Sequence, residues 1–262
     1  MPASKRDAVV MAEESAGGQS VTSRALSILA AFENSTGSLT VAKIAQRAGL
    51  PLSTTYRLIA ELEEWGGLRR GSDGKYGIGF RIWELGQMAG RRLRDRAHPY
   101  LQDLFDLTHE NVHLAIREGT QSLYVDKVYS SRKLPVVSRV GGRLPLHATA
   151  VGRVLLANQP EWFVEAFLQR ELEQPTPKTV TDPKVLRDVL AETRSDGFSV
   201  TMEQMRMGAL SVAVPVNYNG ATVAAIGLVF EVVRYREVRR FLPMLRGTAD
   251  RIEQAMVGTP LR

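Results

Sequence analysis

The chain has 262 residues, of which 44% are hydrophobic, enough for one large domain or two modest ones with a real core. It contains no cysteine, which excludes disulfides, zinc–thiolate sites and thiol catalysis. No apolar run approaches the roughly 18 residues that a membrane span needs. The formal net charge is +6, and residues 20–97 carry 12 Lys and Arg against 7 Asp and Glu. The basic excess of this first third points toward nucleic acid.

Residues 1–19 are mostly small and polar and lack the sustained apolar segment of a secretory signal. We therefore expect a disordered tail there and a cytoplasmic protein.

Three short helices are predicted after the tail. The first starts near Ser20, the second runs from a Thr40 cap to Gly49, and the third starts at Pro51 and ends at Gly66-Gly67. Asp73-Gly74 then separates two short runs, which is a strong hairpin signal. Three helices followed by a hairpin within about 60 residues form the layout of a winged helix-turn-helix.

The third helix, LPLSTTYRLIAELEEWG, has an uneven charge distribution. Its first half has one arginine and no acid, whereas its second half has three glutamates. A recognition helix enters the major groove by its N-terminal residues, where the helix dipole favours phosphate and disfavours acids. The helical period predicts an inward stripe of Leu52, Tyr56, Ile59, Leu62 and Trp65, widened by Leu58. Ser53, Thr54 and Arg57 are predicted on the opposite side, with Thr55 near the boundary.

Residues 80–97 predict a connecting helix with a basic far end, interrupted near His98-Pro99 because proline removes a backbone donor. From residue 98 to the end, strand and helix patterns alternate, and a long amphipathic helix closes the chain. The pattern predicts an antiparallel sheet with helices packed against it, as a separate α+β domain.

Three stretches together resemble one known family, the IclR-type bacterial transcriptional regulators. LTVAKIAQRAGLPLSTTYRLIAELEEWGGLRRGSDGKYGIG resembles its DNA-binding domain, and GGRLPLHATAVGRVLLA and GFSVTMEQMRMGALSVAVPVNYNGATVAAIGLVFE resemble its effector domain. The resemblance implies a winged helix-turn-helix over 20–79, a linker helix over 80–97 and a GAF-like domain over 98–262. It also implies no cofactor, a homodimer or homotetramer, a palindromic or repeated operator, and repression of a small-molecule catabolic operon.

The resemblance also implies which residues contact DNA. The helix would contribute groove contacts, the wing would meet phosphate, and Arg24 would serve either as a phosphate contact or in a structural ion pair. The implied set is Arg24, Ser53, Thr54, Thr55, Arg57, Arg69 and Lys75.

A second implied set lines the effector cavity, with the stretch from Leu134 to Val140 as a wall or lid. Gly227 and Val229 stand where several family members carry small hydroxyl residues, which favours an apolar or aromatic effector among the family's small organic and aromatic acids. Arg153 replaces a usual lysine and keeps a positive charge near the site. The implied set is His147, Thr149, Ala150, Val151, Glu203, Ala209, Ser211, Gly227 and Val229.

Two alternatives remain open beside this regulator. The stretch HENVH, His109 to His113, matches the H-E-x-x-H pattern of zinc hydrolases, which needs both histidines on one helical face. The alternation that follows predicts a strand from about Asn111, so we expect neither a metal site nor an enzyme. The other alternative is an architectural DNA-binding protein whose second domain binds no effector.

Overall fold

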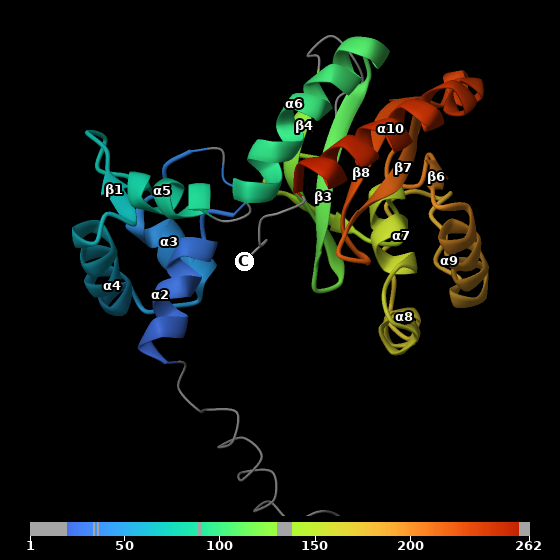
Figure 1. Cartoon of the computed structure of the whole chain (residues 1–262). Helices are drawn as coiled ribbons and strands as arrows, with labels where there is room; N and C mark the ends of the chain where they lie inside the picture. Colours follow the sequence, from blue (N-terminus) through green and yellow to red (C-terminus); the bar gives the residue numbers. More distant parts are fainter. Residues whose placement is uncertain (1–19, 34, 36, 89–90, 130–137, 257–262) are drawn as a thin grey trace, which may run out of the picture. The chain divides into compact units, whose positions relative to one another are not determined.

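The computed structural model describes residues 20–33, 35, 37–88, 91–129 and 138–256 (Figure 1). The chain divides into two compact units between Ala89 and Gly90. The tail predicted over residues 1–19 lies outside the described residues. Within the described part of the chain, no helix is long and apolar enough to cross a membrane.

The first unit begins with three helices whose ends follow the predicted signals. Ser20 and Thr40 cap α2 and α3 through their side-chain oxygens, and Gly49 ends α3 in the left-handed conformation with φ 66°. The bounds are α2 (Val21–Ala30), α3 (Val41–Ala48) and α4 (Leu52–Glu64).

A two-stranded antiparallel hairpin follows as the wing, formed by β1 (Leu68–Arg70) and β2 (Tyr76–Ile78). Gly74 has φ 74° at its turn, a conformation that glycine adopts without steric cost. An isolated bridge between Leu39 and Tyr76 joins this wing to the segment before α3. The predicted winged helix-turn-helix is therefore present, around a core of Ile28, Ala31, Phe32, Leu39, Ile44, Leu58, Ile59, Leu68 and Tyr76.

Helix α5 (Phe80–Met88) closes the first unit, and α6 (Arg91–Thr108) opens the second. The predicted interruption near His98-Pro99 is wrong, because α6 continues through Pro99. Proline removes one helical hydrogen bond, but Ala97, Leu101 and Leu104 on the same helix are fully buried. Burial of this face stabilises the helix across the missing bond.

The second unit contains one antiparallel sheet of six strands in the order β5-β4-β3-β8-β7-β6. The N- and C-terminal strands of the domain thus meet at its centre, where β3 pairs with β8. The bounds are β3 (Asn111–Glu118), β4 (Gln121–Val128), β5 (Arg143–Pro145), β6 (Ser199–Met202), β7 (Ala209–Tyr218) and β8 (Ala221–Glu231).

Helices cover both faces of this sheet (Figure 1). Alternate residues of the central strands face α6 and α10 on one side, and the residues between them face α7 and α9 on the other. The predicted α+β class with an antiparallel sheet is confirmed. The remaining bounds are α7 (Ala150–Ala157), α8 (Glu161–Leu168), α9 (Pro183–Asp196), the 3₁₀ helix η1 (Val232–Glu237) and α10 (Val238–Met256).

Candidate functional site

Helix α4 does not bury the stripe that its sequence predicts. Leu58 and Ile59 are buried as expected, but the residue completing the inward face is Thr55, which is 0% exposed. Its hydroxyl donates to the carbonyl of Pro51 at 3.0 Å. Thr55 therefore belongs to the core, and its predicted contact with DNA is wrong.

The outward face of α4 carries residues that were predicted to be inside. Leu52, Tyr56 and Trp65 are all exposed. Ser53 and Arg57 are exposed as predicted, Thr54 is partly so, and Arg57 Nη1 donates to Glu61 Oε1 at 2.8 Å.

The start of α4 leaves backbone donors available. Its N-cap is Pro51, which provides no side-chain hydrogen bond, whereas α2 and α3 both have capping side chains. The first N–H groups of an α-helix have no partner within the helix, so they can meet an anion such as a phosphate.

The predicted phosphate contacts of the wing are exposed cations. Arg69 lies over the ring of Phe80, with 5.6 Å from Cζ to the centroid, and Lys75 pairs with Asp73 at 3.0 Å. That bond to Lys75 lowers the pKa of the Asp73 carboxyl. Arg24 is half-buried on α2, and the structure shows no ion pair for it among the described residues.

A small cavity lies in the second unit between the start of α7 and the sheet. Thr149 caps α7 by accepting the Gly152 N–H at 3.1 Å. The cavity volume is about 10 Å³, which holds about one water molecule. It brings together six of the nine residues predicted to bind an effector: Thr149, Ala150, Val151, Ser211, Gly227 and Val229.

Sequence reasoning missed two polar aromatic residues of this cavity, His113 on β3 and Tyr124 on β4. Their rings meet edge to face with centroids 5.4 Å apart. His113 Nε2 lies 2.9 Å from Ser138 Oγ. The alternation of β3 already placed His113 on the face opposite Val112 and Leu114, but the sequence could not show which strands would pair there.

Burial determines the ionisation of both side chains. It lowers the pKa of His113 to about 3, with a smaller contribution from the charge of Lys127. Burial also raises the pKa of Tyr124, against a hydrogen bond with Thr149 that lowers it. At neutral pH the cavity therefore presents a neutral imidazole and a neutral phenol, each able to donate or accept a hydrogen bond.

A buried amide without a partner lies in the adjacent row of the sheet. Asn111 is paired across the strands with Val229, and among the described residues neither its side-chain nitrogen nor its oxygen has a hydrogen-bond partner. Asn111 alternates with Val112 and so lies on the cavity side of β3, in the row next to His113. Unsatisfied buried polar groups are costly, so this amide can bind a polar group that enters the cavity.

Gly227 allows α7 to approach the sheet closely. A Cβ at this position would lie 2.9 Å from Cγ1 of Val151 and 3.1 Å from the carbonyl oxygen of Val212. Packing against Val151 thus accounts for the absence of a hydroxyl side chain here.

The other three predicted effector residues lie elsewhere. His147 lines a separate cavity of about 110 Å³, and its Nε2 bonds the carbonyl of Glu173 at 2.8 Å. Burial lowers its pKa, and its Nδ1 has no hydrogen-bond partner in the part of the chain that the structure describes. Ala209 is the first residue of β7, opposite Glu231.

Of the wall predicted from Leu134 to Val140, residues 134–137 lie outside the described residues.

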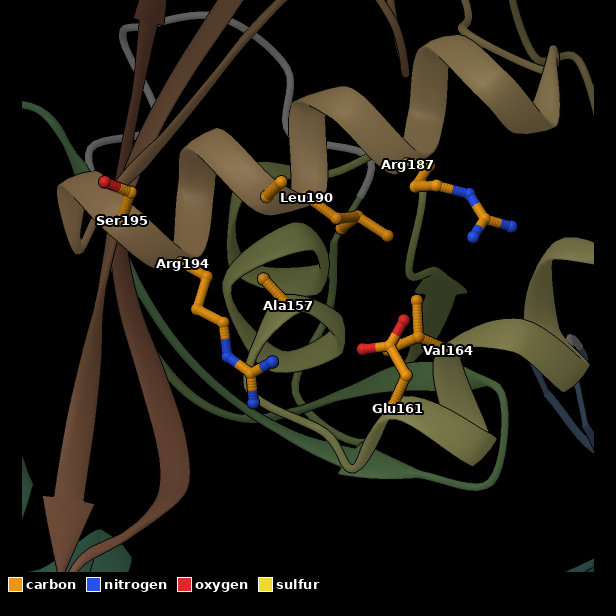
Figure 2. Close-up of a pocket in the computed structure, with 8 residues that line it drawn as sticks. Ala157, Glu161, Val164, Arg187, Leu190, Arg194 and Ser195 are labelled. Atoms are coloured by element: carbon orange, nitrogen blue, oxygen red, sulfur yellow. The ribbon is translucent and has the colours of Figure 1, made fainter.

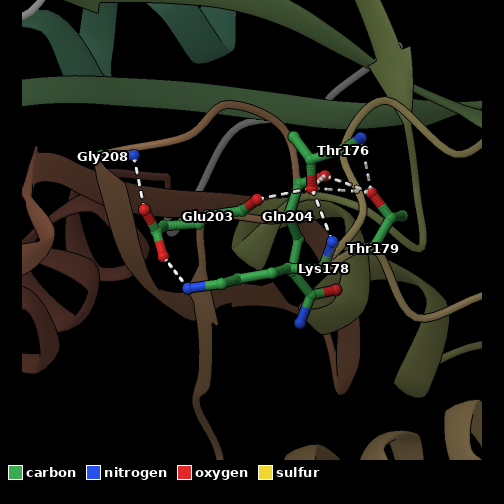
Figure 3. A network of polar contacts seen from close by, with 6 residues as sticks. All are labelled: Thr176, Lys178, Thr179, Glu203, Gln204 and Gly208. Atoms are coloured by element: carbon green, nitrogen blue, oxygen red, sulfur yellow. Dashed lines mark hydrogen bonds and ion pairs between the residues drawn. The ribbon is translucent and has the colours of Figure 1, made fainter.

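Glu203 is the third, and it belongs to a network that holds the turn between β6 and β7 (Figure 3). It has φ 57°, accepts the Gly208 N–H at 2.8 Å and forms an ion pair with Lys178. The bond to Lys178, followed by that to Gly208, lowers its pKa. Thr176 and Thr179 donate to the backbone of this turn. Glu203 thus has a structural role here.

Arg153 supports the loop before α7 and does not face the cavity. Its Nε donates to the carbonyl of His147 at 2.7 Å, and its guanidinium also binds Gln204. Burial lowers its pKa to about 10, which leaves it charged at neutral pH.

A larger open groove lies among α7, α8 and α9, with a volume of about 320 Å³ (Figure 2). Ala157, Val164 and Leu190 form its apolar floor, and Glu161 and Arg194 lie at its edge. None of the predicted effector residues lines it.

The HENVH pattern lacks the geometry of a zinc hydrolase. His109 follows α6 with φ 55°, and His113 lies in β3, which begins at Asn111 as predicted. Within the described ranges, no group of three His, Asp or Glu side chains is placed to hold a metal ion.

Family models match both units. The model of the IclR helix-turn-helix domain matches residues 21–72, and that of the bacterial transcriptional regulator IclR C-terminal domain matches residues 87–254. The chain is 34% identical to the HTH-type transcriptional regulator XynR of Escherichia coli K12, over 78% of this chain and 83% of that protein. It is 32% identical to the transcriptional repressor IclR of the same organism, over 78% and 76%.

A solved structure with a bound ligand is also similar. It is an IclR homolog from Microbacterium hydrocarbonoxydans complexed with 4-hydroxybenzoate. The sequence identity is 31% and the TM-score 0.88, over 92% of this chain and 100% of that one.

Proposed function

Because the chain belongs to the IclR family of bacterial transcriptional regulators, and so is not an enzyme, we propose that it is a ligand-responsive repressor of a small-molecule catabolic operon. The observation that carries the proposal is the buried cavity at the start of α7, in the same chain as a winged helix-turn-helix. Effector binding there would change the affinity for operator DNA.

In this proposal the start of α4 enters the major groove. The contacts with phosphate and base edges come from its uncapped N–H groups and from Ser53, Thr54 and Arg57. The first turn contains no acidic side chain that would repel the DNA. Arg69 and Lys75 of the wing contact phosphate, and Arg24 is a further phosphate contact. Such contacts make binding salt-dependent, with a slope of about −0.9 per phosphate neutralised.

The proposed effector is a small aromatic acid. His113 and Tyr124 offer ring faces and neutral hydrogen-bonding groups, and the first turn of α7 offers N–H groups for a carboxylate. The similar regulator complexed with 4-hydroxybenzoate supports this class. A cavity of about 10 Å³ must widen to admit such a ligand, so effector binding would move the elements that line the cavity.

The assembly is proposed on family grounds as a homodimer or homotetramer on a palindromic or repeated operator. We also propose that it acts in the cytoplasm, where operator DNA lies.

Selection of bound genomic DNA fragments, with and without aromatic and aliphatic acids, tests this function. A short operator sequence should be enriched, and an aromatic acid should reduce its recovery. Thermal-shift measurements should rank aromatic above two-carbon acids; the reverse order would contradict the aromatic class. Operator binding that no acid changes would instead favour the architectural alternative.

Arg57 provides a sharper test of the DNA contacts. Arg57→Ala should lower the ratio of operator to unrelated-duplex affinity about tenfold, because base contacts specify whereas phosphate contacts only position. Fluorescence anisotropy at one fixed salt concentration measures both affinities. An equal loss of affinity for the operator and for the unrelated duplex would mean that Arg57 contacts only phosphate.

A further inference from the structure

Two large side chains of α4 have no place in the core of the first unit. Leu52 is 51% exposed and Tyr56 is 57% exposed. The core face of the helix is instead formed by Thr55, Leu58 and Ile59. Neither Leu52 nor Tyr56 belongs to the hydrophobic core formed by the described residues.

Leu52 and Tyr56 lie one helical turn apart, beside Ser53 and Arg57, which form the adjacent row of the same exposed face. The first turn contains no acid and its N-terminus is uncapped, so this face suits a polyanion. Arg69, Arg70 and Lys75 of the wing add further exposed positive charge to the same unit.

The occupant of this face must combine negative charge with apolar contact points. In the major groove, the C5-methyl of thymine is the apolar group on the base edges, and apolar side chains read it by contact. We propose that Leu52 and Tyr56 are specificity-determining residues that read thymine methyl groups in each operator half-site.

Helix geometry gives the spacing of these thymines. Residues four apart on an α-helix are separated by about 6 Å along its axis, at 1.5 Å per residue. Base pairs follow one another every 3.4 Å or so along one strand, so the two thymines should lie about two base pairs apart.

The proposal rests on the proposed placement of α4 in the groove, and the experiment separates the two. An operator is first obtained by selection from genomic fragments. Each thymine is then replaced in turn by deoxyuridine, which removes only the methyl group, and Kd is measured by anisotropy. The proteins are the full chain and its Leu52→Ala, Tyr56→Ala and Tyr56→Phe variants, with Leu26→Ala as a control that is 59% exposed on α2.

For the unchanged chain, deoxyuridine at two positions about two base pairs apart should raise Kd about fourfold each, as for one buried methyl. Leu52→Ala should abolish the effect at one position and Tyr56→Ala at the other. Tyr56→Phe and Leu26→Ala should retain both effects, because each keeps the two apolar contacts.

Two results would overturn the proposal while leaving operator binding intact: no thymine position that responds to deoxyuridine, or responses that persist in Leu52→Ala and Tyr56→Ala. Failure to select any operator would overturn the proposed function, and this proposal with it.

Discussion

At the scale of single residues, Arg57 forms an ion pair with Glu61 in the DNA-free protein. Its pair with Glu61 is exposed on both sides, and such surface pairs contribute only about 0.2–1 kcal/mol. DNA can therefore displace Glu61 at small cost, yet Glu61 still competes with phosphate for the guanidinium.

Replacement of this competitor should be measurable. Glu61→Gln should tighten binding to unrelated duplex DNA by up to about fivefold, the upper limit that the exposed-pair energy allows. Glu64→Gln is the matched control, since Glu64 is also exposed on α4 and lies seven residues from Arg57. Equal effects in titrations of the two variants would mean that only net charge changed.

His113 gives the second unit a pH-dependent stability. Its pKa is about 3 in the folded state, below the ordinary value of 6.5, so it stays neutral when folded. As pH falls below 6.5, His113 binds a proton in the unfolded chain but stays neutral in the folded chain. The free energy of unfolding therefore decreases by about 1.4 kcal/mol per pH unit. Above pH 6.5 neither state is protonated, and the contribution is constant.

Between pH 7 and pH 5 the unchanged chain should lose about 2 kcal/mol more stability than His113→Gln. Glutamine can keep a hydrogen bond to Ser138 but does not titrate. Urea denaturation at the two pH values measures the difference. Parallel losses in both proteins would contradict a neutral buried His113.

At the scale of elements, packing between α7 and β8 controls the cavity. Gly227→Ala would place a methyl 2.9 Å from Val151 Cγ1 and should destabilise the fold by about 1–3 kcal/mol, the range for overpacked sites. A double-mutant cycle with Val151→Ala checks this by denaturation. The second change should recover part of the loss, whereas strictly additive effects would show that the two side chains do not meet.

The elements themselves were largely predictable, because their signals are local. Ser20, Thr40 and Gly49 bound the first two helices, Asp73-Gly74 turns the wing, and alternation marks β3. The interruption predicted at Pro99 is absent because tertiary burial of α6 outweighs this local helix-breaking signal.

The sites were less predictable, for physical reasons. Hydrophobic periodicity assumes that large apolar residues lie inside, and Leu52 and Tyr56 lie outside while Thr55 is buried. His113 and Tyr124 join the cavity only because β3 pairs with both β4 and β8, a non-local arrangement that alternation within one strand cannot reveal.

At the scale of the whole molecule, the proposed DNA-binding and effector sites lie in separate units and are linked by one free energy of coupling. A ligand can shift operator affinity only by its differential affinity for the two states, and operator must change ligand affinity by the same factor. Since the cavity has to widen for an aromatic acid, a side chain that fills it should remove the coupling without touching α4.

The most direct test is the operator Kd with and without a saturating aromatic acid identified by thermal shift. In the unchanged chain the acid should shift Kd by at least about fivefold, the lower end of usual coupling. Ser211→Val, which adds about one methyl group to the cavity from β7 and removes its hydroxyl, should keep the ligand-free Kd and lose the shift. An acid that binds but leaves Kd unchanged, or a shift that persists in Ser211→Val, would contradict the account.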